Sequence, residues 1–363
     1  MRLFFLFFFL CVSFSVKSNQ LYFQNNEFPS VIIDQLKIIE INTILNNKIE
    51  EYSIDPSVKK IIIKNLISKE NLDYLIKIYP NVVFLKVSEL DNSIEKLNNL
   101  IMLLSSFDNV KYLDLSDNIL FGGRGLVAIT PFLKKIQYLN LSNSSKYDSI
   151  EPLMIKKLAK GTPILEFLDI SNNVLGDDCG RIIYKFKNIE YLSVSNTNIT
   201  EKSLRRWVRF LKNLKYLDLS KNHITRFDLE KLDLTKIIEL DLSDTPIKDS
   251  LKRLGDEDSS LLSLKAHSSD LTDDDLSLLY KKFPRLKVLD LSNNFITPNG
   301  YNVIFSFLES GTSNIEELKI SPSFNDHDKS MTEKLKSFKR NGRLKKLEFY
   351  KKEFLNEDYE LVK

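Results

Sequence analysis

The sequence predicts an α/β solenoid in which parallel strands line a concave face and helices cover the convex side. Three observations lead to this fold class. A pattern of apolar positions recurs about 12 times over residues 58–363, at intervals of 23 to 29 residues. Each copy alternates apolar and polar residues as a strand does, and the residues after it change to helical periodicity. Glycine and proline number only 10 each, which argues against long flexible linkers.

The recurring unit has an apolar residue, two variable positions, an apolar residue, one variable position, another apolar residue and often Asn at the ninth position. Its clearest example reads VKYLDLSDN from Val110. Three other copies are equally complete, and the rest are weaker. The complete copies start at Val110, Leu165, Leu214 and Leu286, and the weaker ones at Val58, Val82, Ile136, Ile189, Ile237, Leu261, Ile315 and Leu344.

This unit resembles the leucine-rich-repeat signature, and its spacing lies within the range of that family. The long helical segments are most similar to the ribonuclease-inhibitor-like subclass, as in residues 296–308 followed by IEEL from Ile315. Repeat lengths are irregular and the ninth position is rarely Cys, so the sequence departs from that subclass. The resemblance therefore implies a horseshoe with a concave parallel sheet and convex helices, but no specific ligand.

Each part of the unit has a physical role. Leu113 and Leu115 are two residues apart, so both point to the same side of a strand, which we expect to be the interior. Residues 203–211 place Leu204, Trp207, Val208 and Leu211 on one helical face. One strand and one helix cannot bury these faces alone, whereas stacked neighbours can.

The ninth position of the unit predicts a ladder of buried polar side chains. An Asn amide there can pair with backbone groups that the turn after the strand leaves unsatisfied. A Thr or Ser hydroxyl at this position can pair with some of the same backbone groups. The expected ladder contains Asn118, Asn173, Asn222 and Asn294, with Thr197, Thr245 and Ser269 in other repeats.

The ends of the chain differ from the repeats. Residues 1–18 read as a signal peptide, because Arg2 precedes an apolar run that is too short to span a bilayer. We expect cleavage after Ser18, a secreted protein, and no stable membrane insertion. Residues 19–57 lack the motif and are interpreted as an amino-terminal helical cap, with a helix starting near Phe28. Residues 58–363 form the repeat domain, including a polar carboxyl-terminal cap.

Cys179 is the single cysteine that remains after cleavage of the leader, which removes Cys11. Its spacing to Ile182, Ile183 and Phe186 predicts a buried position on a helix. An intermolecular disulfide is the alternative.

Three rows of side chains should face the concave surface, because they alternate with the buried leucines, and the third row is nearly all serine. One row is aromatic in six consecutive repeats: Phe84, Tyr112, Tyr138, Phe167, Tyr191 and Tyr216. The next row carries five aspartates: Asp114, Asp169, Asp218, Asp241 and Asp290. Together they predict an amphipathic, mildly acidic surface that suits a protein ligand bearing Lys, Arg and apolar groups. The aromatic residues could instead simply stack on one another.

Other kinds of chemistry have little support in the sequence. The three histidines lie in separate repeats without partner cysteines, so we expect no metal, no cofactor and no catalytic residues. A net charge of +3 makes nucleic-acid binding unlikely, although residues 329–352 are basic. The sequons for N-glycosylation begin at Asn140, Asn143 and Asn198.

The functional expectation is a secreted protein-binding module that is not an enzyme. Two alternatives stay open. The first is a regulator or inhibitor of a partner enzyme, ribonuclease-inhibitor-like or GTPase-activator-like, which the resemblance implies. The second is a structural protein of a wall or coat.

Overall fold

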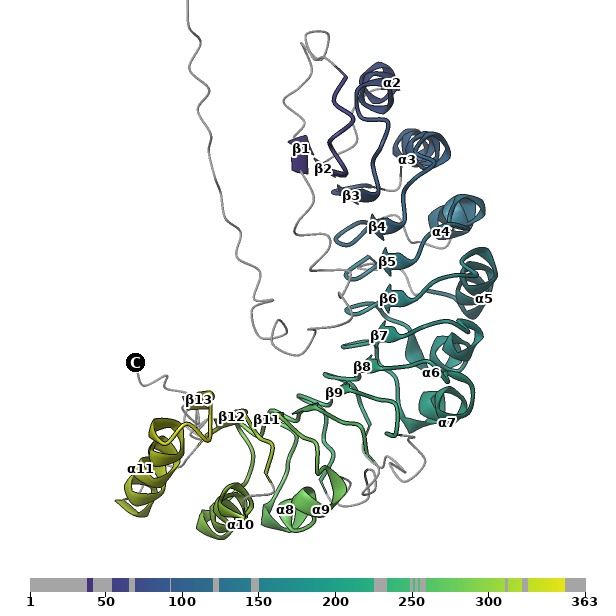
Figure 1. The fold of residues 1–363 in the computed structure, drawn as a ribbon. Coiled ribbons are helices and arrows are strands. Elements are labelled where there is room, and N and C mark those ends of the chain that lie inside the picture. The colour runs from purple at the N-terminus through teal and green to yellow at the C-terminus, as the bar shows by residue number, and fades with distance from the viewer. Residues whose placement is uncertain are drawn as a thin grey trace, which may run out of the picture.

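The computed structural model shows a curved solenoid built on one sheet of 13 parallel strands, ordered along the sheet as they are along the chain (Figure 1). The strands form the inner side of the arc and the helices lie outside it. The structure describes residues 38–41 and 54–349, except 65–68, 92, 120–123, 145–149, 225–233, 249–250, 252–253, 255–258, 311–312 and 322–325.

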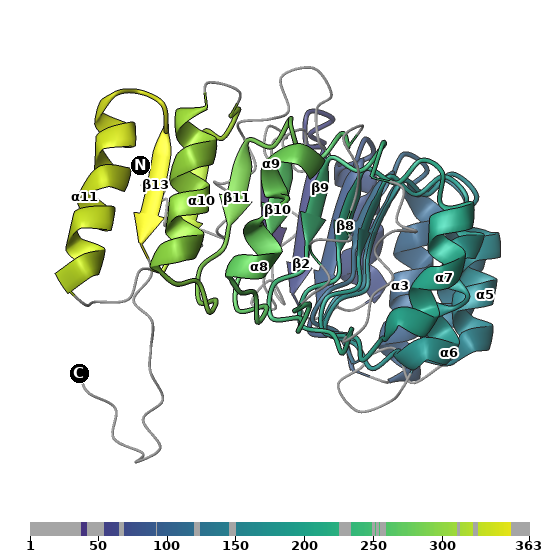
Figure 2. The same ribbon diagram turned by 90° about the horizontal axis from the view of Figure 1, so that it is seen from below.

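The strands recur at the expected positions and run side by side in one direction (Figure 2). They are β1 (Ile38–Ile41), β2 (Lys60–Lys64), β3 (Phe84–Ser88), β4 (Tyr112–Asp114), β5 (Tyr138–Asn140), β6 (Phe167–Asp169), β7 (Tyr191–Ser193), β8 (Tyr216–Asp218), β9 (Glu239–Asp241), β10 (Ser263–Lys265), β11 (Val288–Asp290), β12 (Glu317–Ile320) and β13 (Lys346–Phe349). The predicted solenoid of about 12 repeats is thus confirmed, since β2 to β13 correspond to the twelve copies.

The convex side carries α-helices and short 3₁₀ turns. They are α2 (Lys69–Ile78), α3 (Ile94–Ser106), α4 (Arg124–Ile129), η2 (Thr130–Phe132), α5 (Pro152–Gly161), α6 (Gly176–Gly180), η3 (Ile183–Lys185), α7 (Glu201–Phe210), α8 (Asp273–Leu276), α9 (Leu279–Lys282), α10 (Pro298–Glu309) and α11 (Asp326–Arg340). The helix predicted over 203–211 is α7, whose Leu204 and Trp207 are buried.

A single apolar core lies between the sheet and the helices. Leu113 pairs in register with Leu139 of the next strand, and both side chains are fully buried. Leu115 is fully buried as well, so the inward orientation expected for the paired leucines is confirmed. This shared interior explains why no single repeat needs to be stable alone.

The expected polar ladder runs beside the core. Asn118 Nδ2 donates to the carbonyl of Val87 in the preceding repeat at 2.7 Å, and its Oδ1 accepts from the Leu90 amide at 2.8 Å. Asn222 does the same with the Val194 carbonyl at 2.8 Å. The Thr197 hydroxyl donates to the Val194 carbonyl of its own repeat, and the Ser269 hydroxyl donates to the carbonyls of His267 and of Leu242 in the preceding repeat, as predicted. Each buried amide therefore joins two repeats while satisfying their backbones.

The eighth position of the unit has a conformational role that the sequence analysis did not anticipate. Nine repeats place a non-glycine residue there with φ between 50° and 63°, in the left-handed region. Asn and Asp tolerate this region better than most residues, and they hold most of these positions. The nine are Glu89, Asp117, Asn143, Asn172, Asn196, Lys221, Asp244, Ser268 and Asn293.

The helix predicted around Cys179 needs correction. Residues 176–186 do not form the continuous helix expected around Cys179; α6 ends at Gly180 and η3 follows. The helix is interrupted where α7 packs closest, because the Gly180 carbonyl accepts from Trp207 Nε1 at 2.7 Å. Cys179 is nevertheless buried, as expected.

The segment interpreted as an amino-terminal cap contributes a strand. β1 pairs with β2 in parallel and adds a thirteenth strand to the sheet. The predicted signal peptide and the helix near Phe28 lie outside the described residues.

Candidate functional site: the concave face

The six aromatic residues predicted for the concave face occupy one row across neighbouring strands. Tyr112 pairs with Tyr138, Tyr138 with Phe167, and Phe167 with Tyr191 in the parallel register. Phe84 precedes Tyr112 and Tyr216 follows Tyr191 in the same way. We call these six residues, Phe84, Tyr112, Tyr138, Phe167, Tyr191 and Tyr216, the aromatic row.

The rings of the aromatic row contact one another closely at its centre. Phe167 stacks between Tyr138 and Tyr191, with ring centroids 4.0 Å away on both sides and interplanar angles of 17° and 9°. Tyr112 and Tyr216 lie tilted at the two ends of this stack, 6.3 Å and 6.2 Å from their neighbours. Stacked rings fix one another's orientation, so the row is a rigid surface.

Burial and charge keep the central phenols protonated. Burial raises the pKa of Tyr191 well above its ordinary value, and the carboxylates of Asp169 and Asp218 raise it further. The pKa of Tyr138 is raised for the same first reason, with Asp114 and Asp169 contributing. These hydroxyls therefore stay protonated over the whole physiological pH range.

The five aspartates predicted as binding residues also serve the turn that follows each strand. Asp169 Oδ1 accepts a hydrogen bond from the Ser171 amide at 2.9 Å, and Asp218 Oδ1 accepts from Ser220 at 3.0 Å. The same contact occurs at Asp114, Asp241 and Asp290, and Asn140 makes it with an amide oxygen. One oxygen of each aspartate thus accepts a hydrogen bond from the backbone, and the second oxygen is left for other contacts.

The second carboxylate oxygen of these five aspartates is paired with a lysine in some of them and not in others. Lys86 Nζ lies 3.1 Å from Asp114 Oδ2 at one end of the row. Within the described part of the chain, no such ion pair occurs at Asp169 or Asp218, and Asp218 Oδ2 accepts from the Ser193 hydroxyl at 2.9 Å. The acidic character is therefore concentrated on these two residues beside the aromatic stack.

Burial and nearby carboxylates change the titration of Asp169. Burial raises the pKa of its carboxyl to about 6, against the hydrogen bonds from Ser171 that lower it. Asp218 and Asp114 raise it further by repulsion between like charges. A cationic group placed here by a partner would relieve this repulsion.

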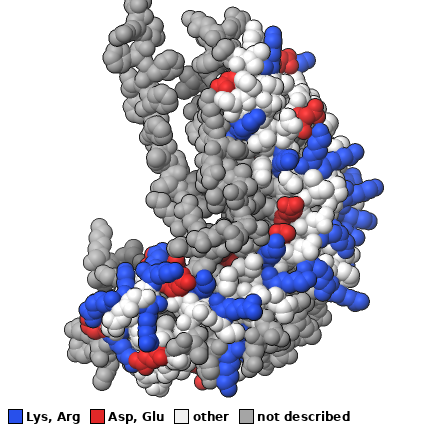
Figure 3. Space-filling model, viewed as in Figure 1, with Lys and Arg blue, Asp and Glu red and all other residues white. Residues whose placement is uncertain are grey.

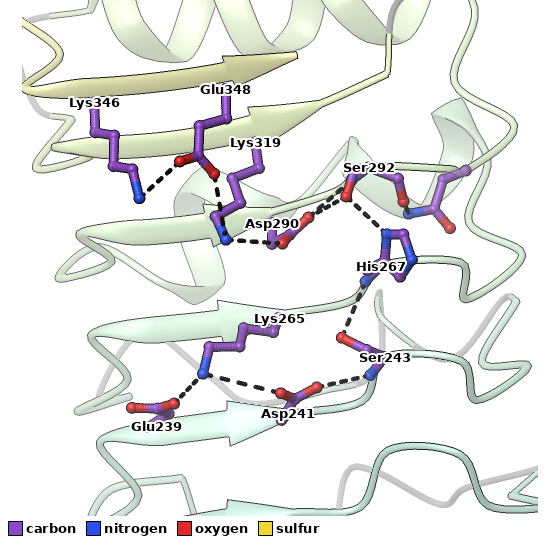
Figure 4. Close-up of polar contacts among 11 residues, drawn as sticks. Glu239, Asp241, Ser243, Lys265, His267, Asp290, Ser292, Lys319, Lys346 and Glu348 are labelled. Carbon is purple, nitrogen blue, oxygen red and sulfur yellow. Dashed lines mark hydrogen bonds and ion pairs between the residues drawn. The ribbon is translucent and has the colours of Figure 1, made fainter. Parts of the chain in front are cut away.

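The other half of the concave sheet satisfies its own charges (Figure 4). Lys265 Nζ lies 2.5 Å from Glu239 and 3.9 Å from Asp241, on the strand beside it. Lys319 lies 3.7 Å from Asp290 and 3.5 Å from Glu348. Strands β9 to β13 thus carry alternating charges that neutralise one another from strand to strand.

The three sequon asparagines lie in different environments. Asn140 is half-buried on the concave face, where its Oδ1 accepts from Ser142 at 2.9 Å. Asn143 is exposed but donates to Asp117 Oδ1 at 2.8 Å. Asn198 is exposed at the turn before α7. Asn198 is therefore the most accessible acceptor of the three.

No group of three or more His, Cys, Asp or Glu side chains that could hold a metal occurs among the described residues. Cys179 donates to the Ile150 carbonyl at 2.7 Å, and burial raises its thiol pKa to about 12, which makes it a poor nucleophile. Among the helices that the structure describes, none is long and apolar enough to cross a bilayer. The expectation of no catalytic or cofactor site remains a prediction.

The lysines that neutralise half of the concave face could have been found in the sequence. Lys265 and Lys319 stand in the same repeat position as the aspartates, so a comparison of adjacent repeats pairs them. Stacking of the aromatic row was the alternative left open by the sequence, and Phe167 does stack on both neighbours. The angles between the rings had no signal in the sequence, because they depend on both neighbours.

Comparisons with known proteins agree with this architecture. The family model described as Leucine Rich repeat matches residues 210–226, which include β8 and Asn222. None of the curated proteins is significantly similar to the chain in sequence.

Several solved structures resemble the fold. An internalin of Listeria monocytogenes is 17% identical over 79% of this chain and 87% of its own, with a TM-score of 0.48. A chain of the TLR13–ssRNA13 complex is 20% identical over 81% of this chain, with a TM-score of 0.48. This chain spans about half of its length, 47%. A chain of the yeast Rad7–Elc1 complex is 16% identical over 72% of this chain and 76% of its own, also with a TM-score of 0.48.

Proposed function

Taking as a premise that the chain is a leucine-rich-repeat protein, we propose that it is a protein-binding module and not an enzyme. Its partner lies against the aromatic row and contacts Asp169 and Asp218. We further propose that the protein is secreted, on the basis of the apolar leader in residues 1–18. If so, the form recovered from the medium begins at Asn19, and an intact leader on that form would contradict secretion by cleavage.

The observation that carries the binding proposal is the coincidence of the aromatic stack with the unpaired carboxylates. Tyr138, Phe167 and Tyr191 form the closest part of the stack. Asp169 belongs to the same strand as Phe167, two residues further on, and therefore faces the same side. Rigid aromatic groups supply contact area at a low cost in conformational entropy, which is why Tyr is frequent at binding hot spots.

The partner that this surface suits has a Lys or Arg side chain next to apolar groups. A guanidinium group can lie over an aromatic ring and donate to a carboxylate at the same time. The aromatic row extends over six strands, about 25 Å at the usual strand spacing. Such a length matches a folded protein surface or an extended peptide.

The test removes three half-buried tyrosines of the row and leaves Phe167 in place. A variant with Tyr138→Ala, Tyr191→Ala and Tyr216→Ala should lose partners that the unmodified chain captures, by a factor of about 100 or more in affinity. Affinity capture with mass spectrometry identifies the partners, and titration of the purified partner measures the loss. A control variant changes three exposed aromatic residues elsewhere: Tyr74, Phe295 and Phe349 to Ala.

The proposal fails if the control loses the partner equally. It also fails if the row variant, still folded at the assay temperature by circular dichroism, binds the purified partner as tightly as the unmodified chain does. A glycan on Asn140 in the native protein would argue against it too, since that residue lies on the same face.

A further inference from the structure

The convex side of the middle repeats carries an unbalanced positive charge. The segments 131–137, 156–164, 181–188 and 202–213 contain thirteen Lys or Arg residues and no Asp or Glu. No one of these segments is an unusual run by itself. The chain as a whole has 52 basic and 49 acidic residues, so this local excess is not a consequence of composition.

The solenoid brings the four segments together. They belong to η2, α5, η3 and α7, which contact one another in successive repeats. Each segment ends shortly before the next strand, β5, β6, β7 or β8, and these strands are adjacent in the sheet. The segments therefore form a continuous surface, which we call the basic patch. Figure 3 shows Lys and Arg crowded on the outer edge over α5 to α7, with few acidic side chains between them.

Two aromatic rings organise the cations at the centre of the patch. Tyr184 and Phe210 lie 5.0 Å apart. Lys187 Nζ lies 5.4 Å from the first ring centre and 5.1 Å from the second. Arg206 lies over the Tyr184 ring and Arg209 over the Phe210 ring, each at 5.5 Å. These cation–π contacts hold the positive groups in place without neutralising them.

Few acidic partners reduce this charge. Among the described residues, Lys135 pairs with Asp108 at 3.4 Å, and Arg181 pairs with Asp178. Both pairs lie at the margin of the patch and are largely exposed, so they screen little of its potential.

Apolar side chains are exposed among the cations. Phe132 is 37% exposed, Ile164 is 43% exposed and Phe210 is 38% exposed. They follow the end of a helix or 3₁₀ turn or occupy its last residue, so all lie towards the edge of the solenoid where the strands begin. A surface that combines exposed apolar tips with many cations suits the interface of a lipid bilayer.

We propose that the basic patch docks the protein peripherally on a membrane that contains anionic lipids. The Lys and Arg side chains contact the headgroups, and Phe132, Ile164 and Phe210 enter the boundary of the acyl chains. A single-stranded nucleic acid suits the patch less well, because such ligands stack their bases on open aromatic faces. Here Lys187, Arg206 and Arg209 already occupy the faces of Tyr184 and Phe210.

The experiment measures sedimentation of the full chain with vesicles of phosphatidylcholine, with and without phosphatidylserine. The unmodified protein should bind only the anionic vesicles, and less tightly as salt is raised. The variant Lys187→Glu, Arg206→Glu, Arg209→Glu should partition at least about 100-fold more weakly, since each basic group near the surface contributes roughly five-fold. The matched control reverses three exposed residues of α11, Lys336, Lys339 and Arg340, and should retain binding.

A second variant separates a membrane from a soluble polyanion. Ile164→Ser keeps every charge and removes one apolar tip that takes no part in the cation–π contacts, so it should weaken vesicle binding several-fold and leave binding to single-stranded RNA or heparin unchanged. An unchanged melting temperature shows that either variant is folded. The proposal is overturned if anionic vesicles are not bound, if the α11 control loses binding equally, or if Ile164→Ser has no effect on vesicles.

Discussion

The two halves of the concave sheet have the same backbone arrangement but present different side chains. Between β3 and β8 the third position of every repeat is aromatic, and the rings stack on one another. Between β9 and β13 that position holds Glu239, Ser263, Val288, Glu317 and Lys346, and the face is crossed by ion pairs. The leucines beneath both halves are equally buried.

This difference indicates where a partner gains most. In the second half Lys265 and Lys319 each contact two carboxylates, so a charged partner would have to displace an existing pair. In the first half Asp169 and Asp218 form no ion pair with a lysine among the described residues, and the adjacent aromatic rings present an apolar surface. Binding energy is therefore expected to concentrate in the aromatic half, while the charged half contributes mainly to solubility.

The largest expected effect on stability comes from the centre of the stack. Phe167→Ala removes a ring that lies between two others at 4.0 Å, so we expect the free energy of unfolding to fall by about 3–5 kcal/mol. Val288 occupies the same row position in the charged half, and Val288→Ala should lower the free energy of unfolding by only about 2 kcal/mol. Chemical denaturation of both variants measures the difference. A loss at Phe167 of no more than about 3 kcal/mol, which burial of its side chain alone accounts for, would mean that stacking adds nothing beyond burial.

Asp169→Asn is expected to have a smaller effect of opposite sign, a gain in the free energy of unfolding. Its pKa of about 6 in the fold lies above the ordinary value of 3.8, so its contribution to stability is complete below about pH 4 and is lost as pH rises through 6. Asp169→Asn removes that loss and keeps the turn contact, as Asn140 does in the preceding strand. The variant should be more stable by about 1–3 kcal/mol near neutral pH and no different in acid.

The paired half supplies the control for this titration. Asp290→Asn breaks the contact with Lys319 at 3.7 Å and should lower stability slightly near neutral pH. Denaturation curves at several pH values compare the two variants. If Asp169→Asn is destabilising near neutral pH, the carboxylate is compensated in a way that contradicts the division of the sheet.

The smallest effect is expected at the end of the ion-pair series. Lys346 lies 2.8 Å from Glu348, and its side chain is 40% exposed, so solvent and salt screen the pair. Lys346→Ala should change the free energy of unfolding by about 0.5 kcal/mol or less. A thermal melt at low and high salt tests this, and a large salt-sensitive loss would show that the charged half depends on cooperation among its pairs.

The sequence alone determined the architecture, because the repeat states which side chains are apolar and at what spacing. The inward leucines, the amide ladder through Asn118 and Asn222, and the alignment of the aromatic row all follow from that period. The continuous helix around Cys179 was predicted wrongly, since periodicity does not reveal that Trp207 of the next repeat binds the Gly180 carbonyl. The strand β1 was missed because its segment lacks the motif.

The repeat places the charged residues on one face, and the tertiary structure decided the distances between them. Lys265 and Glu239 are separated by 26 residues along the chain yet contact each other, because adjacent strands stand in register. The basic patch forms for the same reason, from four segments that are unremarkable in isolation. The pattern of one repeat fixes the face on which a side chain lies, but its partners belong to neighbouring repeats, and their distances depend on the packing of every turn and helix between them.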